Sequence, residues 1–303
     1  MKRMKQFSGP LIGLITIGLF YVETLVVSMT MFIVQIFVRL TPSAMPGHKK
    51  LEIFMNEFPR YWGSLGGWLM LKMTGTKLVV HGRSGLTRKT SYLLLPNHQS
   101  WGDILIIHYA LDAFVSPLRF FMKRQLLWVP VIGLVCKSLG YPFMHRYTKE
   151  QIAKNPKLKG KDLKETQKAC QRFKNMPVSI ISFTEGTRYT EAKAKRQGSP
   201  FKHLLKPKAG GIAFTLFAMS DQIDKILHVT IAYSDFRSPT FWQLCCGKVK
   251  KVIIDVHAEP IPGDIVGDYA NDRDFRVHFQ HWLNDTWHKK DGKFEELLRE
   301  VNA

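Results

Sequence analysis

The chain has 303 residues, of which 45% are hydrophobic, so it is long enough for one large domain with a packed core and an attached segment. Its 44 lysine and arginine residues against 24 acidic ones give a formal net charge of +20, which indicates an anionic partner: a phosphate-bearing lipid, an acidic carrier protein or a nucleic acid. The cysteines show no C-x-x-C spacing and two are adjacent, which argues against a zinc site or a disulfide framework and favours a reducing compartment; they are Cys136, Cys170, Cys245 and Cys246.

The N-terminal segment is predicted to associate with a membrane. Residues 11–38 are apolar apart from Glu23, Gln35 and a few small polar residues. As one helix, these about 28 residues would extend roughly 42 Å, against a hydrocarbon core of about 30 Å, so one tilted span is the preferred interpretation. Because a carboxyl group in lipid is costly, Glu23 leaves open a re-entrant pair of shorter helices. A cleaved signal is not expected, since the apolar run is too long for one.

The next segment, residues 54–73, mixes aromatic and apolar side chains with Arg60 and Lys72. Aromatic residues favour the headgroup level of a membrane, which fits an interfacial helix. A core helix beneath the main domain would show the same pattern. Both interpretations stay open.

From about Thr76 onward, short apolar runs alternate with helical patterns, which predicts an α/β fold. The expected strands cover residues 77–80, 92–95, 119–122, 178–183, 227–233 and 249–256. Helices are expected between most of them, most clearly over 162–174, where a capping-box pattern opens the helix. A last amphipathic helix near 272–289 carries one apolar stripe, formed by Phe275, Phe279, Trp282 and Leu283.

The first candidate for chemistry follows the strand predicted at 92–95, where His98 and Asp103 form a His-x4-Asp pattern. The spacing alone is weak, because eleven histidines would give about half a match by chance. With His98 in a turn and Asp103 in the first turn of a helix, however, the two side chains can converge. The imidazole could then take a proton from an alcohol while Asp103 fixes its tautomer. The alternative is an ordinary turn histidine and an acid that favours the helix dipole.

The second candidate follows the strand predicted at 178–183 and reads Thr184-Glu185-Gly186-Thr187-Arg188. Gly186 permits a tight backbone, Thr187 can hydrogen-bond phosphate oxygens, and Arg188 offers a planar fork for bidentate phosphate contact. Glu185 could orient its neighbours instead of reacting. A plain loop with a salt bridge explains the same residues.

Two further basic residues, Lys123 and Arg146, each end a short apolar run between these segments. Each is either a ligand for an anion or a solvated charge at a strand end. Basic residues also gather in two stretches, with ten basic and three acidic residues over 146–174, and seven and one over 188–208. These stretches are either ordinary solvated surfaces or a surface held against anionic headgroups.

Taken together, these segments resemble the PlsC-type glycerolipid acyltransferases, which include the lysophosphatidate acyltransferases. The resemblance covers roughly residues 79–261 and rests on four segments in order: 97–103, 123–133, 140–146 and 183–188. The continuation after Arg188, the stretch 203–208 and the apolar N-terminus look most like the YihG-type bacterial inner-membrane branch. The family resemblance implies a mixed sheet flanked by helices, with a membrane anchor over residues 1–45 and an acyltransferase domain over 46–303.

The resemblance further implies a reaction and a site. An acyl chain would move from acyl carrier protein or coenzyme A to the free hydroxyl of a lysophospholipid, most specifically 1-acylglycerol-3-phosphate, with no metal or resident cofactor. His98 would be the general base and Asp103 its partner. The acceptor phosphate would be held by Lys123, Arg146, Glu185, Gly186, Thr187 and Arg188. The enzyme would lie on the cytoplasmic face of a bacterial inner membrane.

One residue departs from the family pattern. A Val-Pro pair is usual in the family's fourth segment, whereas this chain has Val229-Thr230. Because that segment is associated with substrate fit, another lysophospholipid or glycerol 3-phosphate remains an alternative acceptor. A covalent intermediate on Ser100 is disfavoured, because no oxyanion turn is recognisable beside it. The competing class is a non-enzymatic basic membrane or nucleic-acid-binding protein, although no base-stacking pattern supports nucleic acid.

Overall fold

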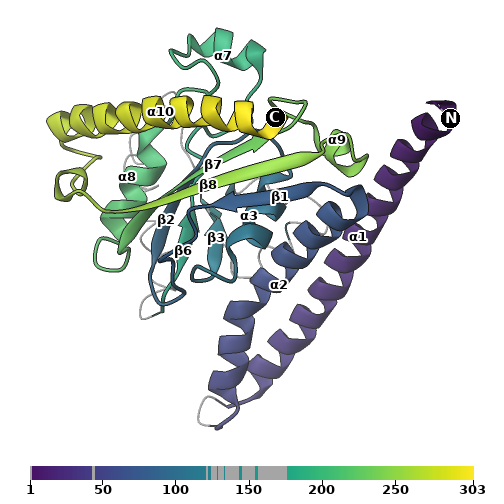
Figure 1. Ribbon diagram of the computed structural model, residues 1–303. Coiled ribbons are helices and arrows are strands. Elements are labelled where there is room, and N and C mark those ends of the chain that lie inside the picture. Colours follow the sequence, from purple (N-terminus) through teal and green to yellow (C-terminus); the bar gives the residue numbers. More distant parts are fainter. Residues whose placement is uncertain are drawn as a thin grey trace.

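The computed structural model describes residues 2–42, 45–120 and 176–303, together with 122–123, 128, 133, 143–144 and 154–155. Its centre is a six-stranded mixed sheet in the order β1-β8-β7-β2-β6-β3 (Figure 1). All neighbouring strands run parallel except β7 and β8, which are antiparallel. The strands are β1 Lys77–His81, β2 Tyr92–Pro96, β3 Leu118–Phe120, β6 Ser179–Ile181, β7 Lys225–Tyr233 and β8 Lys251–Pro260. The predicted α/β fold with a mixed sheet is therefore confirmed.

A second, two-stranded sheet pairs β4 Met122–Lys123 with β5 Phe143–Met144 in parallel. The helix predicted over 162–174 lies outside the described residues.

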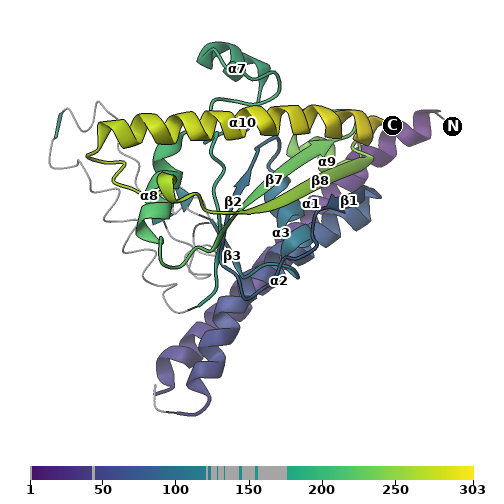
Figure 2. The ribbon, with the colours of Figure 1, turned by 60° about the vertical axis from the view of Figure 1, so that its left-hand side comes forward.

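The central strand β2 explains the layers of the domain, because all five of its residues are buried. Tyr92 and Leu94 face one layer, which includes α3 Asp103–Leu111, and Leu93 and Leu95 face the other. Alternate side chains of a strand point to opposite faces, so a continuous apolar run fits a strand covered on both sides. The second layer contains α8 Ala209–Ala218 and α10 Arg273–Asn302 (Figures 1 and 2).

The C-terminal helix α10 is longer than predicted, because its buried stripe continues past Lys289 to Phe294, Leu297 and Val301. Among the described residues, three further short helices are α7 Glu191–Gln197, α9 Phe241–Cys245 and the 3-10 helix η4 Gly263–Ile265.

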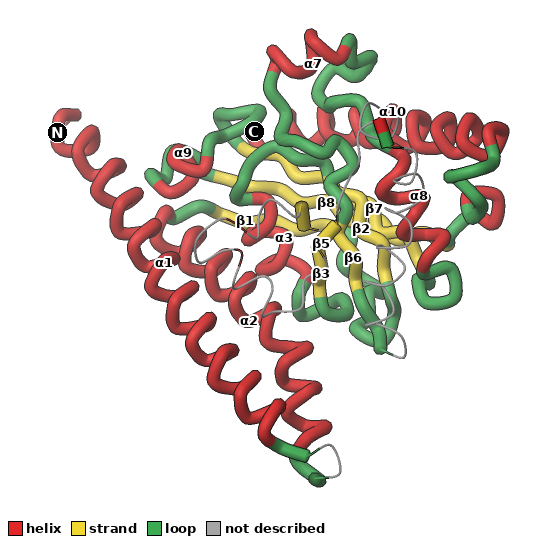
Figure 3. The backbone as a smooth tube through the Cα atoms, turned by 180° about the vertical axis from the view of Figure 1, so that it is seen from behind, coloured by secondary structure: helices red, strands yellow, loops and turns green. Residues whose placement is uncertain are grey.

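The N-terminal helix α1 Lys2–Leu40 is continuous through Glu23, so the predicted alternative of a break near that residue is not observed. It packs side by side with α2 His48–Thr74, and the two form a hairpin that projects from the domain (Figures 1 and 3). Residues 8–40 of α1 have a mean hydropathy of 2.0 over their most apolar stretch, and most of that stretch is exposed. By length and composition this helix can cross a membrane.

The second helix of the hairpin combines a buried face with an exposed aromatic face over residues 54–73. Met70 and Leu71 are buried against the domain, whereas Tyr61 and Trp68 remain 52% and 44% exposed. The helix therefore has one core face and one aromatic outer face.

Two glycines one turn apart allow α2 to approach α3 closely. A Cβ atom at Gly63 would lie 2.3 Å from His108 Cγ, and one at Gly67 would lie 2.4 Å from the Leu105 carbonyl oxygen. Neither position has space for a side chain. The hairpin is thus packed directly on the helix that begins at Asp103.

Candidate active site

The two residues of the first motif meet at the carboxyl end of β2. His98 lies in the turn after the strand and Asp103 begins α3, and His98 Nδ1 is 2.8 Å from Asp103 Oδ2. With its proton on Nδ1, the imidazole donates to the carboxylate and keeps a lone pair on Nε2. This is the arrangement of a general base with an orienting carboxylate.

The Asp103 carboxylate is completely buried and accepts three further hydrogen bonds. The amides of Gln99 and Ser100 donate to Oδ2 over 2.7 and 2.9 Å. The Tyr233 hydroxyl, at the end of β7, donates to Oδ1. These contacts hold the Asp103 carboxylate in one orientation.

Aromatic side chains fix the plane of the His98 ring. Phe183 stacks on it with ring centroids 4.1 Å apart, and Trp101 meets it edge-on at 6.2 Å. The residue is 7% exposed, and its backbone carbonyl accepts a hydrogen bond from the Tyr189 amide over 2.8 Å. The base is therefore rigid and mostly shielded from water.

The backbone of this turn is held by two buried side chains. Asn97 bonds both the amide and the carbonyl of Ile231, at 2.8 and 3.0 Å, as a strand residue would. Glu185 accepts the His98 amide on one oxygen at 3.1 Å and the Leu205 amide on the other at 3.0 Å. Burial raises the pKa of Glu185, while these two amides lower it.

Glu185 consequently lies behind the catalytic turn and not at its surface. Its side chain is 0% exposed and both oxygens are occupied, so it has no free atom for a ligand. This position fits the orienting role that the sequence left open better than the contact with phosphate that the family resemblance implied.

The other residues of the second motif form a basic turn beside the dyad. Gly186 has a φ of +70°, a conformation that glycine adopts without strain, and the Lys208 side chain lies over it. The Lys193 ammonium donates to the Thr187 hydroxyl at 2.8 Å and to the Arg188 carbonyl at 2.9 Å. Three cationic side chains thus surround a turn whose backbone a ligand can approach.

Arg188 connects this turn to the dyad, because its guanidinium lies over the Trp101 ring at 5.0 Å while Trp101 borders His98. Stacking on an aromatic face leaves the edge of the guanidinium free for bidentate contact with an anion. Lys123 lies in β4, but its side chain is outside the described part of the chain, as is the whole of Arg146.

Two alternative nucleophiles in the described part of the chain, Ser100 and Cys245, are poorly placed to react. The Ser100 hydroxyl is buried and accepts a hydrogen bond from the Gly102 amide over 3.3 Å. Burial raises the pKa of the Cys245 thiol to about 12, so little reactive thiolate forms at neutral pH. Cys136 and Cys170 lie outside the described residues.

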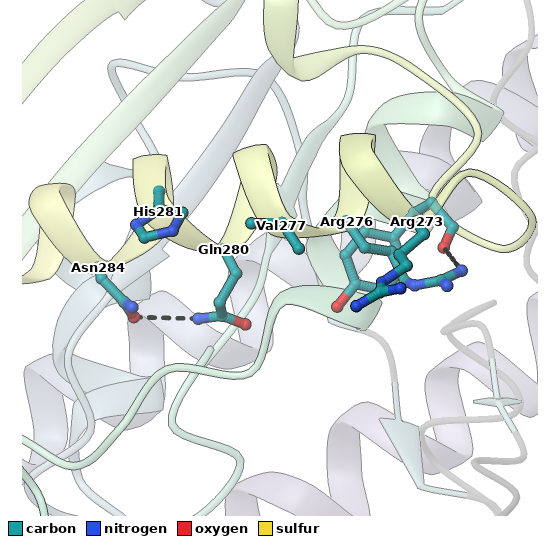
Figure 4. Close-up of a pocket in the computed structure, with 7 residues that line it drawn as sticks. Arg273, Arg276, Val277, Gln280, His281 and Asn284 are labelled. Carbon is teal, nitrogen blue, oxygen red and sulfur yellow. Dashed lines mark hydrogen bonds between the residues drawn. The ribbon is translucent and has the colours of Figure 1, made fainter.

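A separate hollow of about 470 Å³ runs along the outer side of α10 (Figure 4). None of the residues predicted for the site contributes to it; its lining is Tyr269, Arg273, Arg276, Val277, Gln280, His281 and Asn284. Arg276 donates to the carbonyls of Tyr269 and Ala270, so its charge serves mainly to hold the loop before α10.

The sequence did not predict the residues that contact His98 or Asp103 from distant positions in the chain. Tyr233 was placed in a predicted strand without a role, and Phe183 likewise, although each touches His98 or Asp103. Lys290, a buried lysine of α10, was also missed. No local sequence pattern marks these residues, because only the tertiary structure brings them near the dyad and its turn.

Comparison with known proteins gives one family. The family model Acyltransferase matches residues 77–234, which is more than half of the chain. The 2-acyl-1-lysophosphatidylinositol acyltransferase of Saccharomyces cerevisiae is 23% identical over 252 residues, covering 68% of this chain and 61% of the yeast protein. The 1-acyl-sn-glycerol-3-phosphate acyltransferase delta of Mus musculus is 27% identical over 187 residues, covering 58% and 44%. The match therefore covers less than two thirds of the length of these relatives.

Among solved structures, the 1-acyl-sn-glycerophosphate acyltransferase PlsC of Thermotoga maritima is similar, with a TM-score of 0.47 and 17% identity over 88% of this chain and 97% of that one. The family match covers both motifs, the dyad and the basic turn. This chain belongs to the acyltransferase family.

Proposed function

We propose that this protein transfers a fatty acyl chain from a thioester to the free hydroxyl of a lysophospholipid, with 1-acylglycerol-3-phosphate as the preferred acceptor. The observation that carries the proposal is the buried pair of His98 and Asp103, joined at 2.8 Å, beside a basic turn. The pair supplies a base for an alcohol, and the turn supplies cations for a phosphate.

In the proposed reaction, His98 Nε2 removes the proton of the acceptor hydroxyl as the oxygen attacks the thioester carbonyl. Asp103 stabilises the imidazolium that forms. Collapse of the tetrahedral intermediate breaks the carbon–sulfur bond, and the departing thiolate takes the proton from His98. The products are an ester and a free thiol. No step requires a covalent enzyme intermediate, a metal ion or a resident cofactor.

Acceptor choice in the proposal rests on the basic turn. Arg188 offers a fork for bidentate contact with a phosphate group, and Lys193 and Lys208 add positive charge on either side of Gly186 and Thr187. Lys123 and Arg146 are proposed as further ligands on the family resemblance alone. The mouse relative, named for 1-acyl-sn-glycerol-3-phosphate, supports this acceptor, and the yeast relative, named for a lysophosphatidylinositol, supports the alternative of another lysophospholipid.

The proposed location is the cytoplasmic face of a bacterial inner membrane, where the acceptor's own acyl chain stays in the bilayer. The long apolar helix α1, the exposed aromatic residues of α2 and the net charge of +20 support contact with an anionic lipid surface. The donor in this proposal is acyl carrier protein or coenzyme A.

The proposal is tested with membranes that carry the protein, a labelled acyl thioester and a panel of lysophospholipids with glycerol 3-phosphate, and products are followed by chromatography. Transfer to lysophosphatidate should disappear in His98→Ala and persist in His281→Ala, which alters an exposed histidine outside the site. Retained transfer in His98→Ala would remove the assignment of the base. Transfer to no acceptor by the folded wild-type protein would refute the proposed function.

A further inference from the structure

The buried face of α10 contains one charged residue among apolar ones. Its stripe repeats every three or four positions and comprises Phe279, Leu283, Trp287, Lys290, Phe294, Leu297 and Val301. Lys290 is 4% exposed, whereas its neighbour Lys289 faces solvent. Burying an ammonium group is strongly unfavourable unless it is paired, so this lysine needs a compensating partner.

The ammonium group of Lys290 lies against β7, next to the point where the turn that carries His98 begins. It donates to the Val229 carbonyl over 2.9 Å and lies 3.4 Å from the Thr230 hydroxyl. The register partner of Val229 is Pro96, the last residue of β2. Lys290 therefore supplies a hydrogen-bond donor at the point where the β2–β7 ladder ends and the turn that carries His98 begins.

The charge of Lys290 also acts on Glu185. This buried carboxylate holds the His98 amide, and Asp103 nearby disfavours its ionised form, whereas Lys290 favours it. Burial nevertheless raises the pKa of Glu185 to about 8, so Lys290 offsets only part of this effect. Two further titratable groups near Lys290 in the described part of the chain are Asp255 of β8 and His228 of β7.

We infer that Lys290 is a positioning residue for His98. It holds β7 beside the catalytic turn, whose Asn97 bonds the backbone of Ile231 on the same strand, so that the His98 imidazole stays aligned with Asp103. It does not touch substrate. The inference rests on the acyl transfer proposed above and assigns to that reaction a residue from the far side of the sheet.

The departure at Thr230 fits the same arrangement. The family resemblance predicts proline at this position, but proline has no hydroxyl to accept from an ammonium group. In this chain the Thr230 hydroxyl and the Val229 carbonyl together face Lys290. We therefore treat Thr230 and Lys290 as a matched pair.

The test compares Lys290→Met, which keeps the length of the side chain but removes its charge and donors, with Lys289→Met on the solvent side of the same helix. We expect Lys290→Met to lower kcat about tenfold at pH 7, with KM for the acceptor changed less than twofold. Lys289→Met should match the wild type. Lys290→Gln, which keeps a donor without the charge, serves if Lys290→Met fails to fold.

Lys290→Gln separates positioning from general loosening of α10. Glutamine keeps a hydrogen-bond donor for the Val229 carbonyl, so it should recover part of the kcat that Lys290→Met loses. The Tm of both variants is measured beside the kinetics.

Three results are distinguishable. A lower kcat in Lys290→Met at nearly unchanged KM and Tm, partly recovered in Lys290→Gln, supports the inference. An unchanged kcat in folded Lys290→Met, with an active wild type, would overturn it while leaving the proposed function intact, as would equal losses in both variants with a lowered Tm. A wild type without acyl transfer would instead refute the proposed function.

Discussion

The hydroxyl of Tyr233 donates a hydrogen bond to the Asp103 carboxylate, on the oxygen opposite the one that faces His98. Tyr233→Phe should therefore lower kcat about tenfold, equivalent to about 1.4 kcal/mol, because Asp103 loses one of the hydrogen bonds that orient it. Steady-state kinetics on purified membranes measures this effect. Tyr109→Phe, at an exposed position on α3, is the matched control. Wild-type kcat in Tyr233→Phe would show that the two amides alone suffice to hold Asp103.

Arg188 stacks on Trp101 and presents a planar fork near the basic turn. Arg188→Lys should raise KM for lysophosphatidate about tenfold, because a lysine cannot make the bidentate contact, while KM for the acyl donor changes less than twofold. Kinetics with each substrate varied in turn gives both values. Arg196→Lys, on the exposed side of α7, should change neither. An equal rise for acceptor and donor would contradict the assignment of Arg188 to the acceptor phosphate.

Gly67 has no space for a side chain, since its Cβ would lie 2.4 Å from the Leu105 carbonyl oxygen. Gly67→Ala should lower the free energy of unfolding by about 1–3 kcal/mol, because α2 and α3 must move apart. Gly292→Ala is the control, since open space surrounds this helical glycine and alanine should stabilise it by about 0.5–1 kcal/mol. Thermal unfolding in detergent compares the two variants. An undiminished Tm in Gly67→Ala would mean that the helix interface yields easily.

His108 is completely buried, and neither ring nitrogen has a hydrogen-bond partner among the described residues. Burial, with a smaller contribution from Arg119, lowers its pKa to about 3. The unfolded chain takes up a proton below about pH 6.5 and the folded chain does not, so the stability is fully present above that pH and is lost as the pH falls towards 3. The loss should be about 2 kcal/mol by pH 5.

His108→Phe tests this origin of acid sensitivity, because phenylalanine has a similar ring and does not titrate. The variant should unfold at nearly the same temperature at pH 7.5 and should lose less stability than the wild type between pH 6.5 and 5. Intrinsic fluorescence measures both transitions. Parallel losses in the two proteins would assign the acid sensitivity to other groups, of which buried His228, with a pKa lowered to about 4 mainly by burial, is the first to replace.

The strands and the dyad were accessible from the sequence because their signals are local. Buried apolar runs marked the six strands of the main sheet, and the pairing of His98 with Asp103 needs only a turn followed by a helix. Tyr233 was assigned no role and the orienting role of Glu185 stayed one of several alternatives, because these residues bond the dyad and its turn across separations of 130 and 87 residues. Such contacts follow from strand order, which periodicity does not specify.

The end of α10 illustrates a different failure. A run of charges after Trp287 predicts the end of a buried helix, since lysine is rarely buried. Lys290 nevertheless occupies the buried stripe, because Val229, Thr230 and Glu185 supply its partners, and apolar residues resume at Phe294. The predicted helix therefore stopped where the sequence places a buried charge.

The close contact of α2 with α3 at Gly63 and Gly67 has a consequence for how the protein meets lipid. Because α2 packs directly on the helix that begins at Asp103, the hairpin and this helix cannot swing independently. With the hairpin anchored in a bilayer as proposed, His98 stands at one fixed height above the hydrocarbon. Acceptors would then be sorted by the depth at which their free hydroxyl resides, in addition to the charge of their head group.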